Sequence, residues 1–196
     1  MAGLNSFRRV GSGGPLGSRW YFCGQTAIGY NNHGFTPKAT SSSLLYATEL
    51  LGGRGVTIAE VGTWVSALGS AANMRLGIYN VTPNSAGLLY PTTRLVDFGT
   101  KPISTGWQTI TGLSQVLAAG KFYQAAMLFD GTGVGPTVSG LNAREGPAWL
   151  GGDVSLNSGG FITVVQSFGV LPDPFPAGAI VLASATGPTF GCRFSA

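Results

Sequence analysis

The stretch Met74-Arg75-Leu76-Gly77-Ile78-Tyr79 places a large apolar side chain on every second residue from Met74 to Ile78. This period of two is typical of a strand that buries one face. A turn cluster of Pro, Asn, Ser and Gly follows at 83–87, as expected where a strand ends. The longest apolar run, Lys121 to Phe129, predicts a central strand that is packed on both faces. These two segments indicate a β fold.

The rest of the chain from residue 19 also reads as short strands separated by turns. Further strands are expected at Arg19–Cys23, Ser43–Leu50, Val56–Val65, Thr93–Phe98, Gly106–Thr111, Phe161–Val165, Ala179–Ser184 and Phe190–Phe194. The alternation changes phase near Ala59, which indicates a bulge at a sheet edge. Leu113–Ala119 could form a helical turn, but Gly120 ends it. We therefore predict an all-β protein, an antiparallel β-sandwich or jelly roll, in which Asp130–Gly160 forms a long surface loop.

The 196 residues suffice for one domain with an arm. We assign 19–196 to the β-sandwich domain and 1–18 to an extended N-terminal arm. The arm is rich in Gly and Ser and cannot bury enough surface to order alone. We expect it to dock on a partner through Phe7, Arg8, Arg9 and Leu16.

The composition is poor in charge. Asp, Glu, Lys and Arg make up 9% of the chain, against roughly 25% in a typical soluble domain. With 44% hydrophobic residues the chain is not of the disordered class. With so few charges, electrostatic repulsion between neighbouring molecules is weak. We therefore expect subunit contacts, or an exposed face built from Ser, Thr, Asn and Gly.

Nucleic acid and membrane are not expected as partners. The net charge of +4 comes from 11 basic and 7 acidic residues, and the basic residues are scattered apart from Arg8-Arg9. A nucleic-acid-binding protein would concentrate them among aromatic residues. No stretch approaches the ~20 apolar residues of a membrane span, and the N-terminus lacks a signal-peptide pattern. We therefore expect the protein either to stay in the cell that makes it or to leave by a route other than secretion, such as lysis of a bacterial host.

The titratable residues do not form a catalytic motif. His33 is the only histidine, and no nucleophile elbow accompanies it. A glycosidase needs two carboxylates about 5–10 Å apart, and this chain has seven dispersed ones: Glu49, Glu60, Asp97, Asp130, Glu145, Asp153 and Asp173. No EF-hand spacing is present. We expect a non-enzymatic protein without metal or cofactor.

The cysteines and tryptophans allow more than one interpretation. Cys23 and Cys192 could form a disulfide worth about 4 kcal/mol, but two buried free thiols are the default expectation in a reducing compartment. Trp64 and Trp107 lie in predicted strands and are expected in the core. Trp149 lies in the predicted loop and is either the anchor of that loop or a flat platform on which a sugar ring stacks.

Four segments of the chain form an ordered pattern of their own. They are Met74–Asn80, Leu95-Val96-Asp97-Phe98-Gly99, Thr105-Gly106-Trp107 and Leu117–Tyr123. This order resembles a β-sandwich module of tailed-bacteriophage structural, decoration and tail-fibre proteins, with the pattern R-L-G-I-Y, L-V-x-D-x-G, T-G-W and L-x-x-G-x-Y-W. The resemblance covers about residues 56 to 130. Gln124 stands where the family usually has Trp.

The resemblance implies a place in a virion assembled in the bacterial cytoplasm. We expect a capsid decoration (cement) or spike protein, a homotrimer or another small oligomer, whose arm attaches it to the major capsid or tail protein. The alternative is a carbohydrate-binding tail-fibre or adhesin module that contacts a host surface glycan through Trp149.

Overall fold

The fold is an antiparallel β-sandwich. A computed structural model describes residues 20–22, 36–52, 55–83, 89–142, 161–182, 186–188 and 190–195. These residues form strands and no helix, so none of them forms a helix that could cross a membrane. The predicted fold class is confirmed. The proposed arm, residues 1–18, lies outside the described residues.

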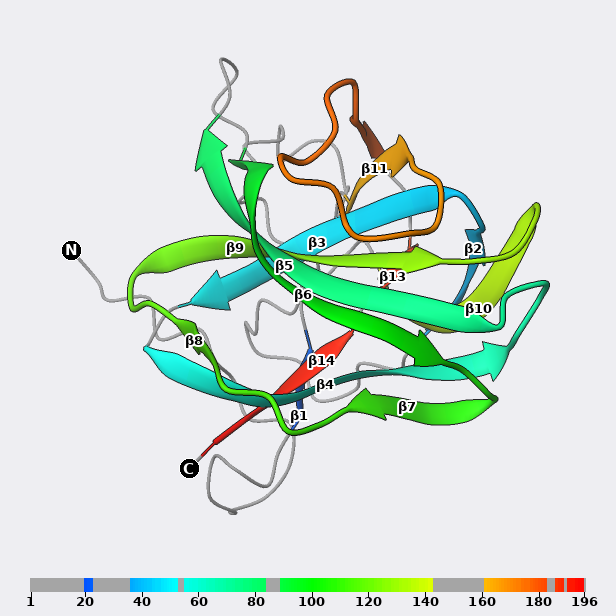
Figure 1. The fold of residues 1–196 in the computed structure, drawn as a ribbon, viewed down its shortest axis with the longest axis horizontal. Coiled ribbons are helices and arrows are strands. Elements are labelled where there is room, and N and C mark those ends of the chain that lie inside the picture. Colours follow the sequence, from blue (N-terminus) through cyan, green and yellow to red (C-terminus); the bar gives the residue numbers. More distant parts are fainter. Residues whose placement is uncertain are drawn as a thin grey trace.

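Two sheets contain the fourteen strands of the described residues. The eight-stranded β4 sheet consists of β1 (Trp20–Phe22), β2 (Thr36–Ser41), β4 (Val56–Ala67), β7 (Gly106–Ile110), β8 (Gln115–Leu117), β10 (Val134–Asn142), β13 (Thr186–Pro188) and β14 (Gly191–Phe194). The six-stranded β9 sheet consists of β12 (Ile180–Leu182), β11 (Phe161–Val165), β3 (Leu44–Gly52), β9 (Lys121–Phe129), β5 (Asn73–Pro83) and β6 (Leu89–Pro102), in that order. Figure 1 shows β4, β7 and β14 below the β9 sheet, and the orange 166–179 segment on the sheet's other side.

The main core fills the space between the two sheets. Its largest members include Ile58, Leu76, Ile78, Leu117, Met127, Phe129, Phe161 and Phe190. A second cluster lies on the opposite face of the β9 sheet and contains Leu45, Tyr79, Ala126, Leu128, Ile162, Leu171 and Phe175. The β9 sheet is therefore covered on both faces, and the molecule has three layers in this region.

Both segments that indicated a β fold form strands, but only one of them is buried as predicted. β9 pairs with β3 on one side and β5 on the other, and Tyr123 to Phe129 are all buried. In β5, Met74, Leu76 and Ile78 point into the main core. Tyr79 is also fully buried, but in the second cluster. The strand expected to be half-buried is thus covered on both faces over part of its length.

Two expectations about the segments that form β8 and β10 were wrong. Residues 134–142, read as part of a surface loop, form β10, which pairs with β2, β4 and β13. Pro136 fits in this strand because the register with β2 shifts between Val134 and Thr137, and proline is tolerated at such bulges. The Leu113–Ala119 segment contains the short strand β8 rather than a helical turn.

The phase change in β4 is a bulge in the middle of a sheet. The register with β14 steps from the pair Glu60–Arg193 to the pair Ile58–Phe194, which leaves Ala59 without a partner on β14. The position is as predicted, but the edge location is not, because β4 has β7 and β8 on one side and β14 and β10 on the other. Beyond the bulge, Val61 and Val65 both point into the core.

Candidate functional site

The sequence predicts binding residues in the N-terminal arm and in the long loop. Phe7, Arg8, Arg9 and Leu16 of the arm, and Trp149 of the loop, lie outside the described residues. His33, Cys23, Glu145 and Asp153 also lie there. Cys192 is free and buried, in agreement with the default expectation for that residue. The described part of the chain offers two other features. One is a segment bound to the β9 sheet by polar and aromatic contacts, here the clasped segment, and the other is the outer face of the β4 sheet, here the open face.

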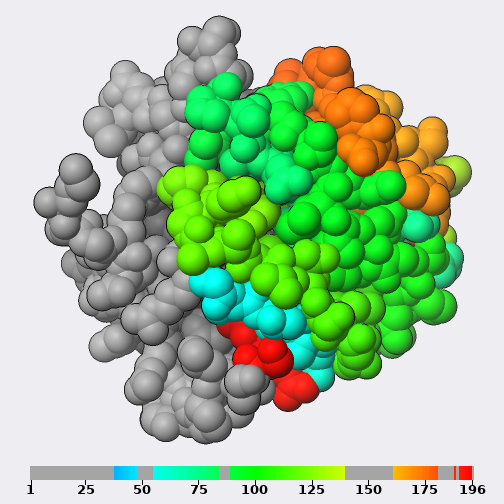
Figure 2. Space-filling view, turned by 60° about the vertical axis from the view of Figure 1, so that its left-hand side comes forward, coloured from blue at the N-terminus to red at the C-terminus, as the bar shows by residue number. Residues whose placement is uncertain are grey.

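The clasped segment is residues 166–179, here called the strap, which connects β11 to β12 across the outer face of the β9 sheet. Figure 2 shows its orange surface lying against the green surface of the neighbouring strands. Leu171 and Phe175 of the strap are buried in the second cluster. Phe175 packs edge-on against Tyr79, with ring centroids 5.0 Å apart, and against Tyr90, at 6.0 Å. Burying one such ring contributes roughly 2 kcal/mol.

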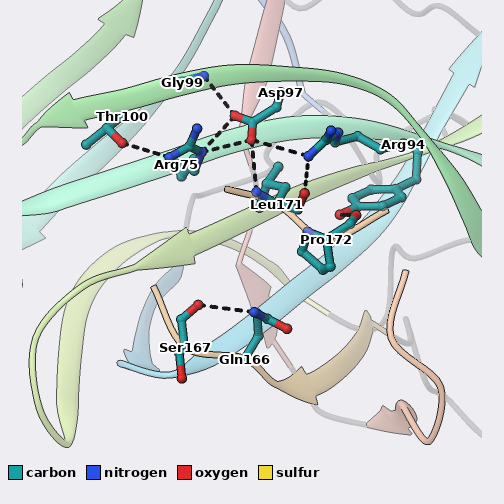
Figure 3. A network of polar contacts seen from close by, with 10 residues as sticks. Arg75, Arg94, Asp97, Gly99, Thr100, Gln166, Ser167, Leu171 and Pro172 are labelled. Carbon is teal, nitrogen blue, oxygen red and sulfur yellow. Dashed lines mark hydrogen bonds and ion pairs between the residues drawn. The ribbon is translucent and has the colours of Figure 1, made fainter. Parts of the chain in front are cut away.

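Asp97 is the centre of the polar network that holds the strap (Figure 3). Its carboxylate accepts hydrogen bonds from Arg75 Nε at 2.9 Å to each oxygen and from the backbone amide of Gly99 at 2.9 Å. The backbone N–H of Leu171 donates to the same carboxylate at 2.9 Å. The side chains of Arg75 and Asp97 are only 15% and 10% exposed, so the ion pair is largely desolvated.

Arg94 completes the attachment. Its guanidinium lies 3.9 Å from the Asp97 carboxylate and donates to the carbonyl oxygen of Leu171. The backbone N–H of Arg94 donates to Asp173 at 3.0 Å. Both backbone polar groups of Leu171 are therefore held by charged side chains of β6.

The alternation of β5 explains why this surface can receive the strap. Leu76 and Ile78 point into the main core, so Arg75, Gly77 and Tyr79 point to the strap. Arg75 supplies the cation. The hydroxyl of Tyr79 donates to the carbonyl oxygen of Pro172 at 2.7 Å. Burial raises the pKa of Tyr79 well above its ordinary value, so this hydroxyl keeps its proton.

Gly77 provides the space that the strap needs. A Cβ atom at this position would lie 2.3 Å from Leu171 Cδ1 and 2.6 Å from the carbonyl oxygen of Val96. Each residue from Arg75 to Tyr79 thus has a structural task. The sequence pattern identified the strand, but it gave no signal for the strap, because 166–179 has no periodicity and its partners lie about 75 to 95 residues earlier in the chain.

The described carboxylates that form ion pairs or hydrogen bonds all hold parts of the fold together. Glu60 pairs with Arg193, Asp97 holds Arg75 and the strap, Asp130 accepts backbone hydrogen bonds, and Asp173 accepts from Arg94. No cluster of three or more potential metal ligands occurs among the residues that the structure describes. Trp64 and the Arg75–Asp97 pair were not singled out as functional from the sequence.

Asp130 joins three turns at one end of the sandwich. Its carboxylate accepts from the backbone amides of Ala72 at 2.7 Å and Asn73 at 2.8 Å, and from Asn73 Nδ2 at 2.6 Å. Its own carbonyl accepts from the Ser42 hydroxyl at 2.8 Å. Partial burial alone would raise the pKa of Asp130, but the hydrogen bonds from Asn73 and Ala72 together outweigh it and hold the pKa below its ordinary value.

We expect this arrangement to lose stability in acid. A carboxylate with a lowered pKa in the folded state contributes stability that is present above its unfolded pKa of about 3.9 and is lost as the pH falls through the folded value. The difference in unfolding free energy between the wild type and Asp130→Asn should be constant above about pH 5 and shrink below about pH 4. Urea titrations from pH 7 to pH 2 would measure it. A gap that stayed constant over this range would contradict the assignment.

The open face is the outer face of the β4 sheet. Trp64 lies on it, because Thr63 and Val65 on either side are fully buried and successive side chains of a strand alternate. The side chain of Trp64 is 49% exposed. The register pairs it directly with the partly buried Trp107 on β7, which places both indoles on one face. The expectation that Trp64 and Trp107 belong to the core was therefore wrong, because both lie on the outer face. The burial of Val65 shows that Trp64, the residue before it, points outward.

No protein-family model matches this chain, and no curated protein matches it significantly. The resemblance of residues 56 to 130 to a phage module therefore stays a prediction.

Proposed function

We propose that the protein is a non-enzymatic structural protein on the outside of a bacteriophage particle, a capsid decoration or spike protein that attaches through its N-terminal arm. The observation that carries the proposal is the agreement between the phage-like sequence pattern and the roles of its residues. Arg75 and Asp97 of the pattern form one ion pair. Gly99, Gly106 and Gly120 all have positive φ angles, of 84°, 102° and 71°. Such angles favour glycine. The ion pair and the three glycines therefore have structural roles, which supports the proposed module.

The architecture supports a rigid surface role. The β9 sheet is covered on both faces, and the strap ties β11 and β12 to β5 and β6 through charged and aromatic contacts. Few charged residues, 9% of the chain, leave a surface suited to contact with other subunits. We propose a homotrimer or another small oligomer, with the major capsid or tail protein as partner of the arm.

Mass spectrometry of purified phage particles tests the proposal. The polypeptide should be present in every preparation at a fixed ratio to the major capsid or tail protein. Particles purified to constant composition that lack it would refute the proposal.

The arm has its own test in a co-sedimentation experiment with particles that lack the protein. A variant with Phe7, Arg8, Arg9 and Leu16 all changed to alanine should fold normally and lose particle binding by about tenfold or more, which corresponds to a modest free energy of about 1.4 kcal/mol. The matched control is Val165→Ser, which alters an exposed apolar residue on β11. Equal binding by the wild type and the arm variant would contradict attachment through the arm.

A further inference from the structure

Trp64 is half-exposed although it lies on β4, a strand that is hydrogen-bonded to neighbouring strands on both sides. β4 has partner strands on both sides, and Thr63 and Val65 are both 0% exposed. These buried neighbours fix the orientation of the backbone at Trp64. A half-exposed indole on such a strand is a rigid feature, and rigid elements position binding groups more accurately than loops.

The surroundings of Trp64 on this face are small or hydroxylated. Gly62, two residues before it, has no side chain, and Ser66, two residues after it, is exposed. The register places Thr109 opposite Gly62 on β7, next to the Trp64–Trp107 pair. The Ser66 hydroxyl donates to the carbonyl oxygen of Thr137 at 3.1 Å, so its oxygen remains able to accept a hydrogen bond. A flat aromatic surface is thus bordered by groups that can bind hydroxyls.

This face carries no net charge among the described residues of β4, β7, β10 and β14. Their only charged side chains are Glu60 and Arg193, which form an ion pair with each other. Glu60 lies four residues from Trp64 along the strand, a distance of about 13 Å at the usual rise per residue. Among the described residues of these four strands, the indole therefore has no unpaired charge beside it that would attract an anionic or cationic partner.

We propose that the outer face of the β4 sheet around Trp64 binds a neutral glycan chain, whose sugar rings stack on the indole. The apolar C–H face of a sugar ring matches a flat π surface, and its hydroxyls match the oxygens of Ser66 and Thr109. A second protein subunit fits this patch less well. A stable protein interface buries about 800 Å² on each partner, whereas the large apolar side chains that the register places here are two indoles, one of them partly buried.

This proposal goes beyond attachment to a phage particle and does not depend on it. It also differs from glycan binding through Trp149, because it places the glycan on another residue. Separate variants of Trp64 and Trp149 distinguish the two. Particle composition tests one function and glycan binding tests the other, so either can fail alone.

Affinity electrophoresis tests the proposal with the full chain. Gels would contain dextran, mixed-linkage β-glucan or galactomannan as neutral probes, and alginate or heparin as anionic ones. We expect at least one neutral polysaccharide to retard the wild type. Trp64→Ala should weaken this binding about tenfold or more, the effect of losing one stacked ring. Trp64→Tyr keeps an aromatic ring and should stay within about threefold of the wild type.

Val165→Ser is the matched control, because it removes a 77% exposed apolar side chain from the other sheet, and it should bind like the wild type. Sedimentation of each variant reports whether the face is a subunit contact. The proposal is overturned if no neutral probe retards the wild type, or if Trp64→Ala binds as the wild type does. It is also overturned if Trp149→Ala, but not Trp64→Ala, abolishes binding. A Trp64→Ala variant that dissociates an oligomer without changing glycan affinity would contradict it as well.

Discussion

Gly77→Ala is expected to destabilise the protein by about 2–3 kcal/mol, the usual cost of forcing an extra carbon into a filled core. The new Cβ would lie 2.6 Å from the carbonyl oxygen of Val96 and 2.3 Å from Leu171 Cδ1. The leucine end could turn away, but the carbonyl belongs to β6, which pairs with β5 at this point. Relief would therefore require the two strands to separate or the strap to lift.

Gly169→Ala is the matched control, since it makes the same change within the strap. No atom lies within 4 Å of a Cβ at Gly169, so this variant should unfold at nearly the wild-type urea concentration. Urea titration monitored by tryptophan fluorescence measures both variants. Equal midpoints for Gly77→Ala and Gly169→Ala would show that the strap does not lie on Gly77.

Asp97→Asn is expected to cost about 2–3 kcal/mol, because it leaves Arg75 largely buried without its counter-charge. Breaking a fully buried ion pair from one side typically costs about 3–5 kcal/mol, and the 10–15% exposure of this pair puts the expected cost at or just below the lower end of that range. The uncharged amide oxygen of asparagine also accepts a weaker hydrogen bond from the Leu171 N–H than the carboxylate does. The strap should loosen before the sandwich unfolds.

Glu60→Gln provides the comparison, since it breaks the ion pair with Arg193, whose side chain is 37% exposed. The Glu60 side chain is 17% exposed, so this pair is closer to solvent than the Arg75–Asp97 pair. Because pairs near solvent contribute less, Glu60→Gln should cost clearly less than Asp97→Asn. Hydrogen exchange of the Leu171 amide separates the two: it should accelerate in Asp97→Asn and stay slow in Glu60→Gln. Unchanged exchange in Asp97→Asn would refute the role of Asp97 in holding the strap.

The sequence predicted the elements whose character is local. The run from Tyr123 to Phe129 is apolar except for Gln124, so its burial on both faces follows largely from composition. The predicted strand Phe161–Val165, which is apolar except for Thr163, matches β11. β10 was missed because Gly135 and Pro136 read as loop residues. They are tolerated in a strand here only because a bulge against β2 accommodates the proline.

The candidate sites depend on contacts between distant residues, and this is why they were not predicted. Asp97 meets Leu171 across 74 positions of sequence, and nothing in the composition of 166–179 indicates which sheet it covers. Trp64 was assigned to the core because a tryptophan in a strand is usually buried. The bulge at Ala59 turns Val61 and Val65 into the core. Trp64, which precedes Val65, therefore points to the outer face of the sheet.

The position of this polypeptide in a cryo-electron microscopy map of the phage particle tests the central proposal most directly. We predict density for the two-sheet sandwich on the outside of the particle, in symmetric copies, with the N-terminal arm directed at the major capsid or tail protein. A particle map in which the polypeptide is absent, or lies inside the shell, would contradict the proposal.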